Sequence, residues 1–397
     1  MPKFFSIIVR HPLRSAKTVP KIRYGAPLQS IFSYLPVTPD CPSAVRPGLI
    51  LFCRAEKLYN IPGRPERVSL NLLKRHNMTS TEELLSIPLD KVNRYIMSEV
   101  DSPVELVNSV CRHLILGGGK RIRPTLLLLS AGLISPDAVH DERVMKLAAA
   151  IEILHTATLM HDDVIDESEM RRGRKSTNSL FGNSVAVLGG DYLFTKAFSL
   201  ASVTENTEIF RDFFRAVSTI ASGEIEQMGN IDHPELSEKA YYHTIYAKTG
   251  VLFEIAVRIP GILFSVSGER LQGLSDYGRY LGNAFQIADD ILDYTSSADE
   301  LGKNIGDDLQ NHKITLPLIY ILNALPDHKK PEAMLAMKSC NLEAVMNLAE
   351  KTGAIARCYE RAEKEASCAR EALGIFPESP YREQLFNLAE MAVRRTR

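Results

Sequence analysis

The chain has 397 residues and a formal net charge of −1, with 47 Lys and Arg against 48 Asp and Glu. Its 45% hydrophobic and 24% charged fractions are ordinary for a globular protein, so they exclude a disordered or fibrous chain. The balanced charge argues against a nucleic-acid binder, and no apolar stretch reaches the about 18 residues of a membrane span. The six cysteines are scattered without a CxxC pair, which favours a reducing compartment such as the cytoplasm.

Residues 1–77 differ in composition from the rest of the chain. Residues 1–39 contain no Asp or Glu, and ten of the 21 prolines lie within the first 65 residues. Because proline removes backbone donors and breaks helical periodicity, we expect 1–77 to be a basic extension outside the folded domain. A mitochondrial transit peptide would explain the missing acids and would place the protein in the matrix. We favour the alternative, an upstream extension with Met78 as the natural start.

Residues 78–397 are predicted to form one all-α domain. Apolar residues recur at three- and four-residue spacing, which is typical of amphipathic helices, and Gly or Pro separates the segments. The first helix has Thr79 or Ser80 as its N-cap, followed by acids in the first turn. A bundle of ten or more helices can hold a deep site between them. The other predicted helical segments are 104–116, 144–159, 184–201, 208–228, 236–257, 271–294, 316–325 and 342–373.

A glycine-rich turn with three cations precedes a helix at 117–124, in the sequence GGGKRIRP. Lys120, Arg121 and Arg123 supply the positive charge, and the backbone N–H groups of a helix N-terminus suit an anion. The segment lacks the GxxxxGK[ST] pattern of a Walker loop. An ordinary basic helix start is the alternative.

Two acidic clusters with the same spacing lie in apolar sequence. Within each, the outer aspartates are four residues apart and therefore share one helix face. Carboxylates on a mostly buried face need positive charge, and Mg²⁺ takes oxygen ligands while bridging to a phosphate. A solvated acidic face is the alternative for either cluster alone, but it explains two matching clusters poorly. The clusters are Asp162, Asp163 and Asp166, and Asp289, Asp290 and Asp293.

Several basic and polar residues near these clusters are candidate phosphate ligands. Arg171 and Arg172 follow the first cluster within about three helical turns. His155 lies two turns before Asp162 on the same face, where a buried structural histidine is the alternative. A single lysine is usually only solvated. The further candidates are Lys248, Thr249, Lys303 and Lys313.

Taken together, these motifs resemble the trans-polyprenyl diphosphate synthase family, and within it the bacterial octaprenyl diphosphate synthases. The resemblance implies an isoprenoid synthase bundle with a central apolar cavity, a homodimer and dependence on Mg²⁺. It also implies head-to-tail condensation of isopentenyl diphosphate with an allylic diphosphate, farnesyl diphosphate, to give a long chain, octaprenyl, for a quinone. The matching stretches are 117–124, 153–173, 181–194, 246–250, 276–294 and 301–309.

The resemblance also implies roles for individual residues. Mg²⁺ would be held by Asp162, Asp166 and Asp289, with help from Asp163, Asp290 and Asp293. The allylic diphosphate would contact Arg171, Lys248, Thr249 and Gln286, with Lys248 also counted as catalytic, while isopentenyl diphosphate would contact Lys120, Arg123, His155 and Arg172. Lys303 is a further substrate-binding residue.

Product length is expected to depend on Ala157 and Thr158, about one turn before Asp162. Small side chains there would leave a tunnel open for a long product, and close packing against another helix is the alternative. The tunnel floor could include Phe213, Phe214 or Met228.

Three other functions stay open. A non-catalytic subunit of a heteromeric synthase is disfavoured by the intact aspartate clusters. An HD-type metal phosphohydrolase, suggested by His140-Asp141 and His161-Asp162, would need more histidines nearby than the chain supplies. A terpene cyclase would leave the second diphosphate site unexplained.

Overall fold

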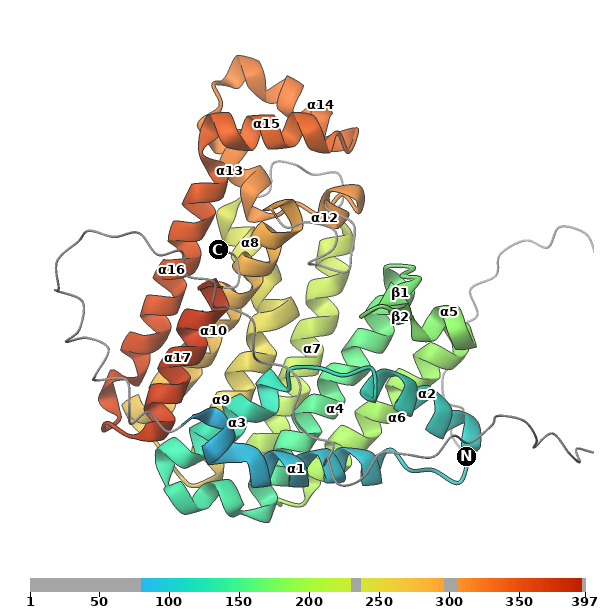
Figure 1. Cartoon of the computed structure of the whole chain (residues 1–397), viewed down its shortest axis with the longest axis vertical. Helices are drawn as coiled ribbons and strands as arrows, with labels where there is room; N and C mark the ends of the chain where they lie inside the picture. The colour runs from blue at the N-terminus through green and yellow to red at the C-terminus, as the bar shows by residue number, and fades with distance from the viewer. Residues whose placement is uncertain (1–79, 230–236, 296–305, 395–397) are drawn as a thin grey trace, which may run out of the picture. The chain divides into compact units, whose positions relative to one another are not determined.

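The structure is a computed structural model that describes residues 80–229, 237–295 and 306–394 (Figure 1). All of these belong to one of the two units into which the chain divides, Arg67–Arg397. The predicted extension 1–77 and the candidate Lys303 lie outside the described residues.

The first helix begins at the predicted signal. Ser80 caps α1 (Thr81–Glu99): its Oγ accepts a hydrogen bond from the Glu83 amide at 3.1 Å, and its own amide donates to the Glu83 carboxylate at 2.6 Å. This capping box satisfies two of the amides that a helix start leaves unpaired. The N-cap prediction is therefore confirmed for Ser80.

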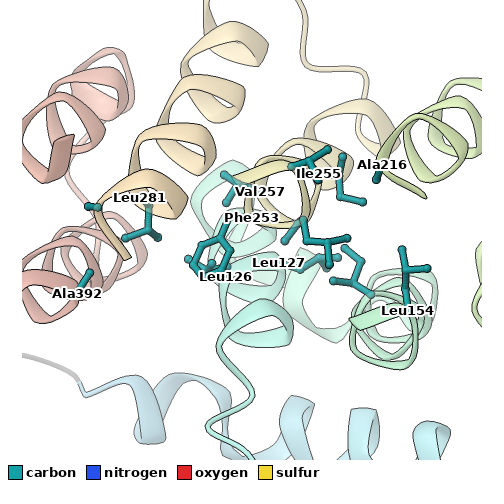
Figure 2. Close-up of a cluster of buried hydrophobic side chains, with 14 of the residues drawn as sticks. Leu126, Leu127, Leu154, Ala216, Phe253, Ile255, Val257, Leu281 and Ala392 are labelled. Carbon is teal, nitrogen blue, oxygen red and sulfur yellow. The ribbon is translucent and has the colours of Figure 1, made fainter. Parts of the chain in front are cut away.

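The centre of the bundle is made by helices that are apolar on most of their surface. Residues 124–133 of α3 (Ile122–Ile134) are all buried, as expected of a helix that is hydrophobic all round. Figure 2 shows Leu126 and Leu127 of α3 beside Phe253 and Val257 of α9 (Val251–Leu263). This core separates the helices that carry the two aspartate clusters.

The two clusters sit near the C-terminal ends of the longest helices. The first ends α4 (Glu142–Ile165), which packs along α6 (Asn183–Ser202). The second ends α10 (Gly268–Thr295), which packs along α9 and α16 (Ala354–Ala372). The predicted all-α bundle is confirmed by this arrangement.

Two segments that the sequence pattern predicted as continuous helices are divided. The described part of 236–257 forms α8 (Glu238–Ile245), a π-helix (Tyr246–Gly250) and the start of α9. Residues 342–373 form α15 (Leu342–Thr352) and α16, separated by Gly353 with a φ of +65°. Glycine tolerates this left-handed conformation, and the chain changes direction there.

A short hairpin, which the pattern did not predict, follows α4. Strand β1 (Met170–Arg171) pairs antiparallel with β2 (Arg174–Lys175). Arg172 and Gly173 connect the strands with positive φ values of 53° and 73°, the conformation that tight hairpin turns require. The hairpin folds Arg171 and Arg172 back toward the end of α4, beside its aspartates.

Helices α9 and α10 meet backbone to backbone through two glycines. A Cβ placed on Gly278 would lie 2.6 Å from the Cα of Glu254, and one on Gly282 would lie 2.6 Å from the Cα of Gly250. Only glycine permits this approach, so the close contact sets the register between the π-helix and the second cluster.

The remaining elements complete the bundle and its edges. None of the helices within the described ranges has the length and apolarity needed to cross a membrane. The other helices are α2 (Glu105–Ile115), α5 (Thr177–Phe181), α7 (Thr207–Gly229), α12 (Asp307–Gln310), α13 (Leu316–Ala324), α14 (Lys330–Lys338) and α17 (Pro380–Arg394), with 3₁₀ turns at Pro136–His140, Asp327–Lys329 and Leu373–Ile375.

Candidate active site

A polar cavity of about 370 Å³ opens between the glycine-rich turn, α4, the hairpin and α10. It brings together many residues that the sequence nominated from distant segments. We call it the basic cavity, because four cations border it. Its lining includes Gly119, Lys120, Arg121, Arg123, Glu152, His155, Arg172, Thr249, Gln286 and Asp289.

Two arginines of the glycine-rich turn occupy different environments. Arg121 pairs with the buried Glu152 of α4, with 2.7 Å between Nη1 and Oε1. Arg123 instead lies over the ring of Phe253, 5.0 Å from its centroid, and its buried Nε finds no hydrogen-bond partner among the described residues. A buried donor of this kind calls for an acceptor, and a diphosphate oxygen would supply one.

Burial and like charges perturb the cations and the histidine of the cavity. Burial lowers the pKa of Arg123 to about 10, although Glu152 and Asp289 partly oppose the change. Burial and then Arg123 and Arg172 hold the pKa of His155 well below its usual value. His155 is therefore a neutral imidazole at pH 7 that offers one N–H, rather than a fifth positive charge.

Arg172 reaches the cavity because the glycine-rich turn leaves room for it. A Cβ placed on Gly119 would lie 3.0 Å from the Arg172 Nη1, so the guanidinium packs on bare backbone. Burial and the neighbouring Arg171 lower the pKa of Arg172. Positive charge is thus concentrated in the cavity beyond what its carboxylates balance.

Carboxylates dominate the neighbouring region, which we call the acidic mouth. Its carboxylates surround the half-buried Lys248 of the π-helix, whose pKa is raised because Glu224, Asp308, Asp162 and Asp166 outweigh the effect of burial. Asp166 also accepts from the Lys313 Nζ at 3.1 and 3.3 Å. The acidic mouth consists of Asp162, Asp166, Glu224, Lys248, Asp293, Asp308 and Lys313.

The mouth holds more negative charge than its two lysines offset. Burial raises the pKa of Asp162 to about 6, with Glu224 adding to the effect and Lys248 opposing it. Burial and Asp308 raise the pKa of Asp293 to about 6, although its Oδ2 accepts from the Asp308 amide at 3.1 Å. Both shifts come first from burial and then from neighbouring carboxylates, so a cation bound here would favour the ionised forms.

The middle aspartates of both clusters have protein partners. Asp163 is fully buried and its Oδ1 lies 2.7 Å from the Arg171 Nε. Asp290 accepts from the Tyr241 hydroxyl at 2.7 Å and from the Gln286 Nε2 at 2.9 Å, and burial raises its pKa to about 8. These contacts orient Arg171 and Gln286, whereas help with Mg²⁺ stays a prediction.

The π-helix joins the two regions. Lys248 lies among the carboxylates, while the next residue, Thr249, borders the basic cavity and donates to the Gln286 Oε1 at 2.6 Å. Single-turn π-helices occur often at functional sites, because they shift the direction of adjacent side chains. Here the π-helix directs Lys248 to the acidic mouth and Thr249 to the basic cavity.

The donor set of the acidic mouth fits Mg²⁺ as a partner shared with phosphate. Its oxygens are hard carboxylate ligands, and a bound cation would oppose the effect of burial that raises the pKa of Asp162. No three such side chains in the described ranges converge into a cage of their own. Asp162, Asp166 and Asp289 therefore remain the predicted ligands, with the rest of the coordination left to substrate and water.

Sequence reasoning missed four residues of the site. Glu152 balances Arg121, Glu224 and Asp308 act on Lys248, and Tyr241 holds Asp290. Glu152 had a signal, since it lies three residues before His155 and is the one charged residue in the otherwise apolar stretch 147–154. The others become visible only in three dimensions.

The chain-length candidates differ in burial. Ala157 is fully buried, and Thr158 is buried with its hydroxyl donating to the His155 carbonyl at 2.8 Å. Phe213 is fully buried, whereas Phe214 and Met228 are 58% and 56% exposed. The contribution of these three side chains to a tunnel floor stays a prediction.

The two His-Asp pairs that suggested a phosphohydrolase are far apart. His140 precedes α4 and His161 lies near its end, which separates them by about 30 Å. His161 also packs on Gly190 of α6, with its Nε2 3.0 Å from the Val187 carbonyl oxygen. They cannot share one metal site.

Comparison with known proteins decides the family. The model of the family described as polyprenyl synthetase matches residues 104–352. The chain belongs to this family. Over 325 residues it is 40% identical to octaprenyl diphosphate synthase of Escherichia coli, covering 81% of this chain and all of that one. It is 41% identical over 307 residues to a geranyl-diphosphate-specific all-trans-nonaprenyl-diphosphate synthase of Rhodobacter capsulatus, covering 77% and 94%.

Solved structures of the polyprenyl synthetase family share the fold. A decaprenyl diphosphate synthase from Rhodobacter capsulatus has a TM-score of 0.75 at 36% identity, covering 80% of this chain and 98% of that one. A polyprenyl synthase from Caulobacter crescentus, complexed with calcium and isoprenyl diphosphate, has a TM-score of 0.74 at 35% identity, covering 81% and 99%.

Proposed function

We propose that this protein condenses isopentenyl diphosphate head-to-tail with an allylic diphosphate and releases a long-chain all-trans polyprenyl diphosphate. The observation that carries the proposal is the juxtaposition of a basic cavity and an acidic mouth on either side of one π-helix. A reaction of two diphosphate substrates would use both halves. One diphosphate would bind the cations of the basic cavity, and the other would bind near the carboxylates of the acidic mouth together with Mg²⁺. The family and the long-chain synthases among its relatives support the same reaction.

The two halves would bind the two substrates. Isopentenyl diphosphate suits the basic cavity, where Lys120, Arg123 and Arg172 supply charge and neutral His155 supplies one donor. The allylic diphosphate suits the border with the mouth, near Lys248, Thr249 and Asp289, with Arg171 and Gln286 oriented by the middle aspartates. Binding in adjacent pockets brings the reacting carbons together.

The chain would promote departure of the allylic diphosphate electrostatically. Its C–O bond breaks with the electron pair leaving on the diphosphate, and the double bond of isopentenyl diphosphate attacks the allylic carbon. The released diphosphate accepts the proton lost as the new double bond forms. Lys248 stabilises the developing charge, and Mg²⁺ held by Asp162, Asp166 and Asp289 would supply further charge compensation.

The apolar walls would protect the reaction from water. Phe253 lies beneath Arg123, and Ile122 and Phe285 line the cavity beside the charged groups. Excluding water prevents capture of a reactive allylic carbon and strengthens the interactions inside.

Incubation with Mg²⁺, labelled isopentenyl diphosphate and either geranyl or farnesyl diphosphate tests the proposal. A ladder of linear polyprenyl products is expected, and its length and preferred primer test the predicted octaprenyl product and farnesyl primer. Relatives of near-equal identity make octaprenyl and nonaprenyl chains, so both lengths must be resolved. Free phosphate, a cyclic hydrocarbon or no turnover would each contradict the proposal.

Product length would depend on the space beside Ala157. Because this residue is fully buried one turn below Asp162, Ala157→Val and Ala157→Phe should shorten the product in proportion to added volume. Thr158 offers a second position for the same series. Unchanged product length in folded variants would show that the tail runs elsewhere.

A homodimer is proposed on an apolar face of α7. Phe214 and Ile225 lie three turns apart on this helix, and they are 58% and 71% exposed. A second copy of the chain would cover them, since large apolar side chains gathered on one face favour association. Light scattering should show a dimer that Phe214→Glu and Ile225→Glu together convert to a monomer.

Residence in the cytoplasm and use of the product for a quinone stay proposals. The four cysteines in the described ranges are all free thiols, which supports a reducing compartment.

A further inference from the structure

The π-helix that carries Lys248 and Thr249 needs support from its surroundings. Its hydrogen bonding is looser than that of an α-helix, with the Val251 amide donating to the Tyr246 carbonyl five residues earlier. Such turns are rare and persist where packing holds them. The contacts around residues 246–250 therefore determine where two substrate-binding side chains point.

Two glycines hold the turn from opposite sides. Gly223 of α7 abuts the Cβ of Ala247, and Gly282 of α10 abuts the Cα of Gly250. These close contacts, possible because both helices present glycine, fix where the turn lies between the helices. They do not anchor its first residue, Tyr246, whose ring lies beside Gly250.

A buried carboxylate anchors Tyr246. The tyrosine hydroxyl donates to the Glu254 Oε2 at 2.9 Å, and the Arg215 Nη2 donates to the Glu254 Oε1 at 3.1 Å. Glu254 lies on α9 one turn beyond the π-helix and is buried. Burial and Glu254 raise the pKa of Tyr246, so the hydroxyl remains a donor at neutral pH.

We propose that Glu254 is a positioning residue for diphosphate binding. Through Tyr246, and with its charge balanced by Arg215, it keeps residues 246–250 in the π conformation that directs Lys248 to the acidic mouth and Thr249 to the basic cavity. This inference rests on the proposed function, because it assigns the purpose of the contact to the diphosphate of that reaction.

The same polar network provides a matched control. Arg215 also contacts Asp212 at 3.2 Å, and Asp212 pairs with Arg258 at 2.9 Å. Arg258 in turn donates to the Ser275 Oγ at 3.2 Å. Ser275→Ala removes this partly buried hydrogen bond, and the one that the Ser275 hydroxyl donates to the Leu271 carbonyl, without touching Tyr246. It therefore measures the general cost of weakening the network.

The test compares Tyr246→Phe, Glu254→Gln and Ser275→Ala in the full-length protein. Calorimetric binding of inorganic pyrophosphate with Mg²⁺ reports on the site without turnover, and thermal unfolding reports on stability. Tyr246→Phe and Glu254→Gln should weaken pyrophosphate binding by about three- to tenfold, the value of one or two hydrogen bonds. Ser275→Ala should leave it unchanged.

A double-mutant cycle shows whether the two residues act together. Tyr246→Phe combined with Glu254→Gln should weaken pyrophosphate binding little more than either change alone, because both remove the same anchor. In turnover, KM should rise for the allylic diphosphate and not for isopentenyl diphosphate. A purely structural role would lower the melting temperature without separating the two KM values.

The outcomes separate this inference from the proposed function. Pyrophosphate binding that is equal in all three variants and the unmodified chain would overturn the positioning role, whatever happens to stability. Weaker binding in the two variants of a chain that makes no polyprenyl product would support positioning and refute the proposed function. An unmodified chain that binds no pyrophosphate would overturn both.

Discussion

The basic cavity and the acidic mouth border the same π-helix but deal with charge in opposite ways. In the cavity, Arg121 is paired with Glu152, while Arg123 is held over an aromatic ring with an unsatisfied donor. In the mouth, the described carboxylates outnumber Lys248 and Lys313, and the pKa values of Asp162 and Asp293 rise to about 6. One half lacks an anion and the other lacks a cation, so a metal-bound diphosphate would complete both.

The largest expected effect lies in the mouth. Asp162→Asn and Asp289→Asn should each lower kcat by about 10²–10³-fold, the usual cost of removing one group that stabilises developing charge. Glu142→Gln, at the exposed start of the same helix α4, is the matched control and should leave kcat unchanged. Steady-state turnover with saturating Mg²⁺ measures this, and near-normal activity in both variants would contradict the metal assignment.

A smaller effect is expected from the cavity. Arg123→Lys keeps the charge but loses the planar donor set, so KM for isopentenyl diphosphate should rise by about ten- to a hundredfold. Arg143→Lys, at the exposed start of α4, serves as the control. If KM for the allylic substrate rises instead, the two pockets have been assigned the wrong way round.

In the absence of metal, the acidic mouth and the basic cavity should change the stability of the fold in opposite directions as pH changes. The raised pKa of Asp162 means that the native state keeps a proton that the unfolded chain releases between about pH 4 and 6, so this contribution to stability falls as pH rises through that window. The lowered pKa of His155 means that the unfolded chain binds a proton below about pH 6.5 that the native state does not bind. The contribution of His155 to stability therefore falls as pH drops.

Urea unfolding between pH 4 and 7 separates these contributions. Relative to the unmodified chain, Asp162→Asn should lose stability more steeply on acidification and His155→Gln less steeply. Each full proton difference changes the free energy of unfolding by about 1.4 kcal/mol per pH unit. Identical slopes in all three proteins would show that neither group is perturbed as described.

The smallest expected effect concerns the pair between Lys313 and Asp166. Both side chains are partly exposed, and the pair occupies a carboxylate that Mg²⁺ would use. Lys313→Met should lower the Mg²⁺ concentration for half-maximal activity by a few-fold, because a weak competitor is removed. A higher Mg²⁺ requirement would show that Lys313 instead holds the bridging diphosphate.

Much of this contrast could be predicted from the sequence. Helical periodicity gave the bundle, and the four-residue spacing correctly put Asp162 and Asp166 on one side of α4, where both act on Lys248. The same geometry explains why Asp163 is different. It is rotated about 100° from its neighbour, which turns it to Arg171.

The remainder depended on contacts between distant segments. A π-helix in residues 246–250 cannot be seen in a 3.6-residue period, because it depends on Gly223, Gly282 and Glu254 packing around it. The hairpin that returns Arg171 to α4 is too short for an alternating pattern. Nor could periodicity show that Glu152 would meet Arg121.

The glycine contacts between α9 and α10 have a consequence for an enzyme that repeats one reaction on a lengthening chain. No layer of side chains separates Gly278 from Glu254, or Gly282 from Gly250. Because the two backbones are in direct contact, these helices cannot slide past each other and should move as one rigid unit. Lys248, Thr249 and Asp289 belong to this rigid unit. The distances between them should therefore be the same in the first condensation and in the last. Any movement that makes room for a growing product must then occur in α4, α6 and α7. These helices, rather than α9 and α10, would determine how many condensations take place.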